Sequence, residues 1–240
     1  MAHIKELKFL KNHKELVDEN YSMVAVPTFS DTMDKDLAQL FKSQNKTGKV
    51  GELVFEIDNE SRVVYYGLGN SSEKTPENFR RAAGEIVGYA LKHKYSDIAV
   101  ECPVSDEGEY FCQAFAEGLI LSSYRFLDYF TDQRGDYHLN GITMVGACNE
   151  EAAKKGVIIG SAVCDSRDLG NHPGNVTTPT RLAEFATEVG KKGDMKVTIL
   201  IEKNLLKWEW DLLLALLKVL MSLQNLLSWN ILVVKKMKNQ

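Results

Sequence analysis

The strongest constraint on the fold of this chain is the alternation of short β-rich runs with helical patterns through residues 1–148. The runs rich in β-branched and aromatic residues lie at 23–26, 52–57, 62–67, 98–100 and 142–146. Strands separated by helices require crossover connections, so the helices must pack on a sheet that the strands share. The alternation therefore predicts an α/β fold with a mixed sheet flanked by helices.

Periodicity and capping signals place the helices between these runs. A long helix is predicted over 76–94, because Thr75 can cap its N-terminus and proline is favoured at its first position. Apolar residues recur at helical spacing over 109–123 and predict a second long helix. A turn at Asp58-Asn59 separates two of the β-rich runs, which predicts a hairpin.

The segment Gly67-Leu68-Gly69 follows one of these runs and leaves two hypotheses open. Glycines after a strand can let the backbone approach a phosphate, as in dinucleotide-binding turns. The alternative is a plain turn between a strand and a helix. The plain turn is favoured, because a third glycine and a following acidic residue at the expected offsets are missing and a hairpin precedes the turn.

Net charge and the N-terminal sequence bear on the partners and the location of this protein. With 29 basic and 33 acidic residues the net charge is -4, so no nucleic-acid partner is predicted. No membrane partner is predicted either, and the leucine-rich end of the chain is a weak candidate for one. The N-terminus shows no apolar segment that would direct secretion, which predicts a cytoplasmic protein.

Cysteine and histidine spacing gives no metal motif. The four cysteines lack C-x-x-C spacing, and each is interpreted as a small buried apolar residue in preference to a reactive thiol. They are Cys102, Cys112, Cys148 and Cys164. A lone histidine is more often a packed or surface residue than a metal ligand. The isolated histidines are His3, His13, His93, His138 and His172.

A second α/β unit begins after a stretch rich in Asn, Pro and Gly at 170–179. A helix over 152–168 is predicted to lead into that stretch, whose composition is typical of a junction between domains. Thr178-Pro179 supplies the cap and first residue of another helix, and 196–200 is predicted to be a strand.

The junction resembles a motif of the leucyl aminopeptidase family of cytosolic, two-metal exopeptidases. Its residues fit the family pattern Arg-x-Leu-x-Asn-x-Pro-x-Asn-x-x-Thr-Pro at Arg167, Leu169, Asn171, Pro173, Asn175, Thr178 and Pro179. Other segments are similar to the family in the same order: 66–69 with 79–83, and 117–119 through 124–126. The resemblance covers residues 1 to about 204.

The resemblance implies four parts in this chain and an incomplete second α/β domain. The first is a non-catalytic N-terminal domain similar to macro domains, and the second is a linker helix with the junction. The third is the first β/α element of the catalytic domain, and the last is an aberrant tail rich in Leu and Trp. Their expected bounds are 1–148, 149–170, 171–204 and 205–240.

The family's chemistry is the removal of N-terminal amino acids from peptides by two divalent metal ions, zinc or manganese, in full-length hexamers. Neither of the family's two metal-binding segments, one like Gly-Lys-Gly-x-Thr-Phe-Asp-Ser-Gly-Gly and one like Asn-Thr-Asp-Ala-Glu-Gly-Arg, is found in this sequence. We therefore predict no catalytic, cofactor-binding or metal-binding residue in this chain. Peptide substrates are expected only for a full-length protein, and this chain alone is predicted to be inactive.

The tail suggests a shifted reading frame. Residues 205–240 hold twelve leucines and all three tryptophans but no glycine. The codons of Lys207-Trp208-Glu209-Trp210-Asp211, read from the last base of the lysine codon, encode Met/Val-Gly-Met/Val-Gly, which resembles the family at this point. We expect that a single-base frameshift truncated the catalytic domain and left the strand at 196–200 unpaired.

Two other functions remain open from the sequence. The N-terminal domain resembles macro domains, some of which bind ADP-ribose, so a binding or assembly module is the alternative to a peptidase domain. The leucine-rich tail leaves a third hypothesis, contact with a membrane or with a partner helix.

Overall fold

The computed structural model describes residues 4, 6–11, 21–57, 62–103, 108–132, 137–146, 148–201 and 231–235. It divides into two compact units, Met1–Asp168 and Leu169–Gln240. Most of the predicted aberrant tail, 205–240, lies outside the described residues, as do His3 and His13. The domain bounds drawn from the resemblance remain predictions.

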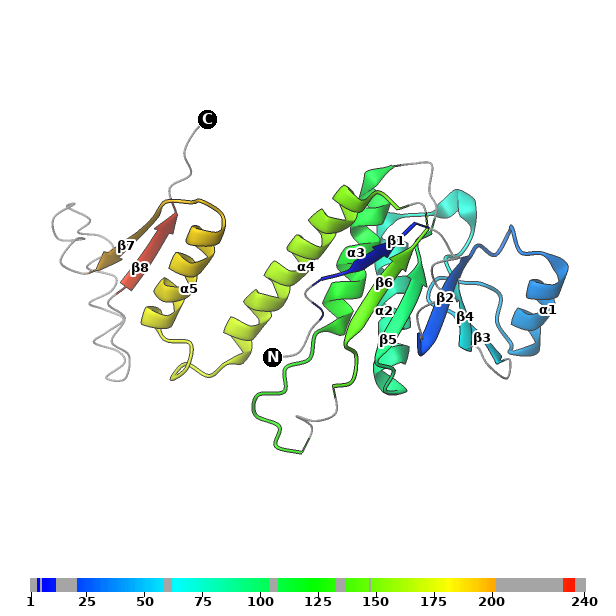
Figure 1. Ribbon diagram of the computed structural model, residues 1–240, viewed down its shortest axis with the longest axis horizontal. Coiled ribbons are helices and arrows are strands. Elements are labelled where there is room, and N and C mark those ends of the chain that lie inside the picture. The colour runs from blue at the N-terminus through cyan, green and yellow to red at the C-terminus, as the bar shows by residue number, and fades with distance from the viewer. Residues whose placement is uncertain are drawn as a thin grey trace. The chain divides into compact units, whose positions relative to one another are not determined.

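The first unit contains one mixed six-stranded sheet, which confirms the predicted fold class (Figure 1). Its strands are β1 (Lys8–Leu10), β2 (Met23–Thr28), β3 (Leu53–Ile57), β4 (Arg62–Gly67), β5 (Asp97–Glu101) and β6 (Gly141–Val145). The strand order is β1-β6-β5-β2-β4-β3, and only the β3–β4 pair is antiparallel. That pair is the predicted hairpin.

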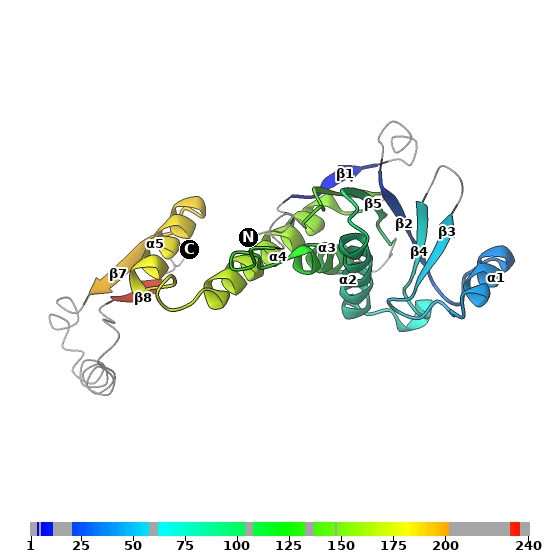
Figure 2. The same ribbon diagram turned by 90° about the horizontal axis from the view of Figure 1, so that it is seen from below.

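Helices α2 (Pro76–Lys92), α3 (Glu109–Ser123) and α4 (Glu150–Asn171) lie on one face of the sheet (Figures 1 and 2). Helix α1 (Lys35–Ser43) lies beyond the β3 edge, and a short 3-10 turn, η2 (Ser71–Glu73), precedes α2. The Thr75 side chain caps α2 as predicted, accepting a hydrogen bond from the Asn78 amide at 3.2 Å.

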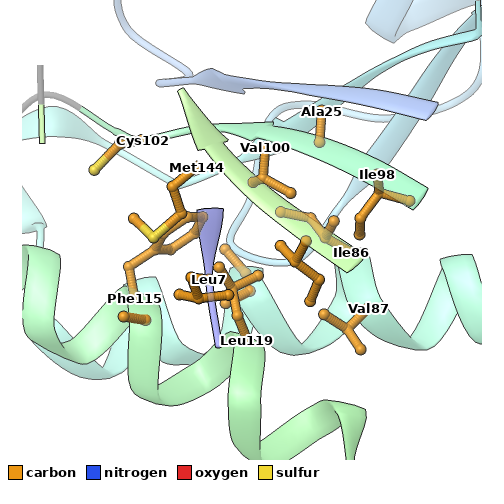
Figure 3. Close-up of a cluster of buried hydrophobic side chains, with 14 of the residues drawn as sticks. Leu7, Ala25, Ile86, Val87, Ile98, Val100, Cys102, Phe115, Leu119 and Met144 are labelled. Carbon is orange, nitrogen blue, oxygen red and sulfur yellow. The ribbon is translucent and has the colours of Figure 1, made fainter. Parts of the chain in front are cut away.

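The core lies between the sheet and these helices (Figure 3). Alternate residues of β5 and β6 point into it, so that Ile98 pairs with Ile142 and Val100 with Met144. Opposite them, α2 contributes Ile86 and Val87 while α3 contributes Phe115 and Leu119 (Figure 3). These apolar side chains account for the helical and alternating patterns in the sequence.

Helices α2 and α3 cross in close contact at Gly118. A Cβ atom built on Gly118 would lie 2.7 Å from the Arg80 carbonyl oxygen and 2.8 Å from the Ala83 Cβ atom. Beside this point the Arg80 Nε atom donates to the Glu117 carboxylate at 2.7 Å, and Gln113 donates to the other carboxylate oxygen at 2.8 Å. Segments 79–83 and 117–119, which carry part of the family resemblance, therefore build a helix interface.

The second unit contains α5 (Pro179–Lys192), β7 (Val197–Ile201) and β8 (Ile231–Lys235). The expectation that the strand at 196–200 lacks a partner is wrong, because β7 pairs antiparallel with β8. The β8 sequence Ile-Leu-Val-Val-Lys is rich in β-branched residues and suits this pairing. Among the residues that the structure describes, no helix has both the length and the apolar character needed to cross a membrane.

Candidate functional site

Three cysteines from separate elements converge beside the carboxyl ends of β5 and β6. Cys102 directly follows β5, Cys112 lies in the first turns of α3, and Cys148 lies between β6 and α4. Parallel neighbouring strands end at the same edge of a sheet, so the residues after β5 and β6 are brought together. This edge is where open α/β sheets commonly bind ligands.

The three sulfur atoms lie within 4.8 Å of one another. The distance between the Sγ atoms is 3.6 Å for Cys102 and Cys112, and 3.0 Å for Cys112 and Cys148. Cys102 is fully buried at the end of the core beyond Met144 and Phe115 (Figure 3), whereas Cys112 and Cys148 are half-buried. The cluster thus has one buried sulfur atom and two that are partly open to solvent.

Two of the three cysteines lie close to the N-terminal ends of helices. Cys112 is the fourth residue of α3, and Cys148 precedes Asn149, whose side chain accepts a hydrogen bond from the Ala152 amide and so caps α4. The N-terminal end of a helix carries a partial positive charge that favours a thiolate over a thiol. The position of Cys112 in the first turn of α3 therefore favours its thiolate form.

Hydrogen bonds among the three cysteines shift the pKa values of their thiols in different directions. Hydrogen bonds from Cys102 and then from Cys148 lower the pKa of Cys112 well below its usual value, against the effect of burial. Hydrogen bonding to Cys112 raises the pKa of Cys102. Cys102 lowers the pKa of Cys148, but Cys112 and burial outweigh it and raise that pKa to about 12. Of the three thiols, Cys112 is therefore the one whose deprotonation the cluster favours.

The cluster does not fit the two divalent ions that the family resemblance implies. Two-metal hydrolysis requires ions about 3.5–4 Å apart, and hard ions such as manganese prefer carboxylate oxygen donors. Among the described residues, the three cysteines form the one group of three or more His, Cys, Asp or Glu side chains arranged to hold a metal ion. His93, His138 and His172 belong to no such group.

The Gly67-Leu68-Gly69 turn is closed by the chain's own backbone. The Gly69 amide donates to the Gly48 carbonyl at 3.0 Å, and a Cβ atom built on Gly67 would lie 2.3 Å from the Lys49 carbonyl oxygen. The space that a phosphate would need next to these glycines is therefore taken by 48–49. The structure supports the plain turn over the dinucleotide-binding turn.

The family-like junction serves a structural purpose in the residues described. The buried Asp168 side chain accepts a hydrogen bond from the Tyr124 hydroxyl at 2.8 Å, which ties the end of α4 to the end of α3. Thr178 caps α5 by accepting from the Arg181 amide at 3.2 Å, as predicted. These contacts shape the chain and bring no catalytic groups together.

The cysteine cluster was missed from the sequence because its members are 10 and 36 residues apart. Spacing along the sequence treats each cysteine separately and predicts a small buried apolar residue at each position. A usable signal was nevertheless present: Cys102 and Cys148 each follow a predicted strand by a few residues, and those strands are neighbours in the sheet.

The chain shares its α/β fold with part of the solved leucine aminopeptidases. A mutant of tomato leucine aminopeptidase superposes with a TM-score of 0.67 at 20% identity, over 84% of this chain and 46% of that one. The bottromycin maturation enzyme BotP, solved in complex with Mn, superposes with a TM-score of 0.66 at 21% identity, over 78% of this chain and 40% of that one.

Sequence comparison identifies the family. Residues 16–133 match the N-terminal domain of the cytosol aminopeptidase family. A probable cytosol aminopeptidase of Bdellovibrio bacteriovorus is 32% identical over 69% of this chain and 36% of its own length. One of Roseiflexus castenholzii is 33% identical over 58% of this chain and 30% of its own length. The chain belongs to the cytosol aminopeptidase family, which confirms the resemblance, and spans about a third of these relatives.

Proposed function

We propose that this chain provides the non-catalytic N-terminal domain of a cytosolic, metal-dependent aminopeptidase and does not hydrolyse peptides by itself. The observation that carries this proposal is the match of residues 16–133 to the family's N-terminal domain. The α/β fold of the chain is also similar to that of a solved leucine aminopeptidase. The family's manganese or zinc ions would then be bound by the remaining two thirds of a full-length relative. The donor chemistry of the described residues supports this division, because thiols are poor ligands for a hydrolytic two-metal centre.

The architecture suits an assembly role. On α4, Ile158, Ile159 and Val163 expose 69%, 44% and 38% of their surface to solvent, although a helix normally turns such residues inward. In our proposal the catalytic part of a longer relative covers these side chains. The hexameric state expected for full-length proteins is part of the same proposal.

A chimaera tests this function. Residues 1–168 of this chain would be joined to the part of the Bdellovibrio bacteriovorus relative that lies beyond its aligned N-terminal domain. We expect the chimaera to hydrolyse leucine p-nitroanilide with added manganese, whereas the 240-residue chain and the relative's catalytic part alone show little activity.

Two controls sharpen the result. The chimaera carrying Ile158→Asp and Val163→Asp is expected to lose activity while its N-terminal domain stays folded, because charges on α4 would oppose the proposed contact. Metal-dependent hydrolysis by the purified 240-residue chain would contradict the proposal outright.

A further inference from the structure

The convergence of three sulfur atoms is more than the packing of three small apolar residues requires. Cys102, Cys112 and Cys148 come from three separate parts of the chain, yet their sulfur atoms contact one another. The fourth cysteine shows the ordinary case: Cys164 is buried on α4, and its sulfur atom lies 4.0 Å from the Ile120 carbonyl oxygen, with no second sulfur atom in contact. The cluster therefore calls for a chemical explanation.

Thiolates are the ligands that soft cations prefer, and zinc binds them at about 2.3 Å. A tetrahedron with bonds of that length has sulfur atoms about 3.8 Å apart. The two distances measured in the cluster, 3.0 and 3.6 Å, are shorter than this value by less than about 1 Å, and all three sulfur atoms lie within 4.8 Å of one another. Shifts of less than about 1 Å in the half-buried cysteines would bring all three into bonding distance of one ion.

We propose that Cys102, Cys112 and Cys148 form a thiolate site that binds one Zn²⁺ ion. All three ligands come from the first unit. With three protein ligands, the fourth position of the ion remains open to water or to another ligand. The half-buried positions of Cys112 and Cys148 give the ion a route in from solvent.

The charges around the cluster favour a cation. The Glu109 carboxylate at the start of α3 accepts a hydrogen bond from the Asn149 side chain at 3.3 Å, beside Cys148. Glu150 follows at the start of α4, where Lys154 pairs with it at 3.5 Å. The three sulfur atoms would repel one another as thiolates, and a divalent cation removes that repulsion.

The competing explanation is a disulfide between Cys112 and Cys148. Peroxide could oxidise this pair, with two thiols and one hydrogen peroxide giving one disulfide and two waters. A disulfide would use two of the three sulfur atoms, whereas Cys102 lies 3.6 Å from Cys112 and is fully buried. The metal accounts for all three cysteines.

Zinc binding by the whole 240-residue chain tests the proposal. The chain would be reduced, freed of metal and held under nitrogen, and then titrated with Zn²⁺ against a chromogenic chelator. We expect one Zn²⁺ per chain, with affinity reduced about 100-fold or more in each of Cys112→Ser and Cys148→Ser. Cys164→Ser is the matched control, and it should bind like the parent chain.

Cobalt substitution reports the ligands directly. Co²⁺ bound by the reduced chain is expected to show a thiolate-to-metal charge-transfer band that is weakened in Cys112→Ser and unchanged in Cys164→Ser. Circular dichroism of each variant without metal separates lost binding from lost folding, and Cys112→Ser and Cys148→Ser replace side chains that are only half-buried.

Three results would overturn the site. The first is a reduced chain that takes up less than about a tenth of an equivalent of Zn²⁺. The second is binding that survives both Cys112→Ser and Cys148→Ser. The third is a chain that forms the Cys112–Cys148 disulfide with peroxide yet binds no metal when reduced, which would identify a redox pair. None of these readouts depends on peptidase activity.

Discussion

The close crossing of α2 and α3 predicts that two Gly→Ala substitutions in these helices will differ in their effect on the free energy of unfolding. Gly88 lies in α2 and has nothing within 4 Å of an added Cβ atom, so Gly88→Ala should stabilise the chain by about 1 kcal/mol through helix propensity. Gly118→Ala gains the same propensity in α3, but its Cβ atom would lie 2.7 Å from the Arg80 carbonyl oxygen.

The magnitude follows from that contact. Carbon and oxygen atoms pack at about 3.5 Å, so the helices must separate by nearly 1 Å, and overpacking of this kind costs about 1–3 kcal/mol. The separation would also stretch the hydrogen bond between Arg80 and Glu117, which is 2.7 Å long. We therefore expect Gly118→Ala to be less stable than Gly88→Ala by about 1–3 kcal/mol.

Urea unfolding followed by far-ultraviolet circular dichroism measures this difference. The helices of the first unit dominate that signal, whereas the three tryptophans all lie at 208–229 and would report on the tail. Equal free energies of unfolding for the two variants, with unchanged dependence on urea, would refute the close crossing.

Three further substitutions test other contacts. Glu117→Ala should lower the free energy of unfolding by about 2–4 kcal/mol, because Arg80 and Gln113 lose the buried carboxylate to which they donate hydrogen bonds. Glu117→Gln should lower it less in the same urea assay. Burial raises the pKa of Glu52, but hydrogen bonds from the Thr47, Lys49 and Gly48 amides outweigh it and lower that pKa from its usual value. The folded state therefore favours the carboxylate, so the stability advantage of the parent chain over Glu52→Gln should be present at pH 7 and should fall as the pH is lowered below 4.5. A difference that does not change with pH would contradict this. Thr178→Ala removes the N-terminal cap of α5 and should destabilise that helix by about 1 kcal/mol. Faster amide hydrogen exchange in the first turn of α5 measures this change, and Thr180→Ala, at an exposed position, is the control.

The sequence predicted the elements whose patterns are local. The strands at 98–100 and 142–146 and the helix over 109–123 were all found, because each buries a regular set of apolar residues against the others. The strand β1 was missed, since Lys8-Phe9-Leu10 is too short to show alternation. Its pairing with β6 joins residues more than 130 positions apart, which no local pattern reports.

The family resemblance singled out residues of α2 and α3 but did not show what role they have in the structure. Arg80, Glu117 and Gly118 matched the family as sequence, and the structure shows that they join α2 to α3. The cysteine cluster presents the reverse case, since each cysteine was visible and the task arises only when the sheet brings their elements together. Chemistry that depends on three distant segments can be predicted only after the order of the strands is known.

The strand order also explains why the candidate site lies where it does. Two neighbouring pairs of parallel strands, β2 with β4 and β5 with β6, end at the same edge of the sheet. Beyond the end of β4 the space next to the sheet edge is occupied by the backbone of 48–49, which contacts Gly67 and Gly69. Beyond the ends of β5 and β6 the same edge carries the thiols of Cys102, Cys112 and Cys148, and the last two are partly open to solvent. Ligand chemistry in the first unit is therefore expected at the cysteines, and the glycine turn is expected to hold the sheet edge together.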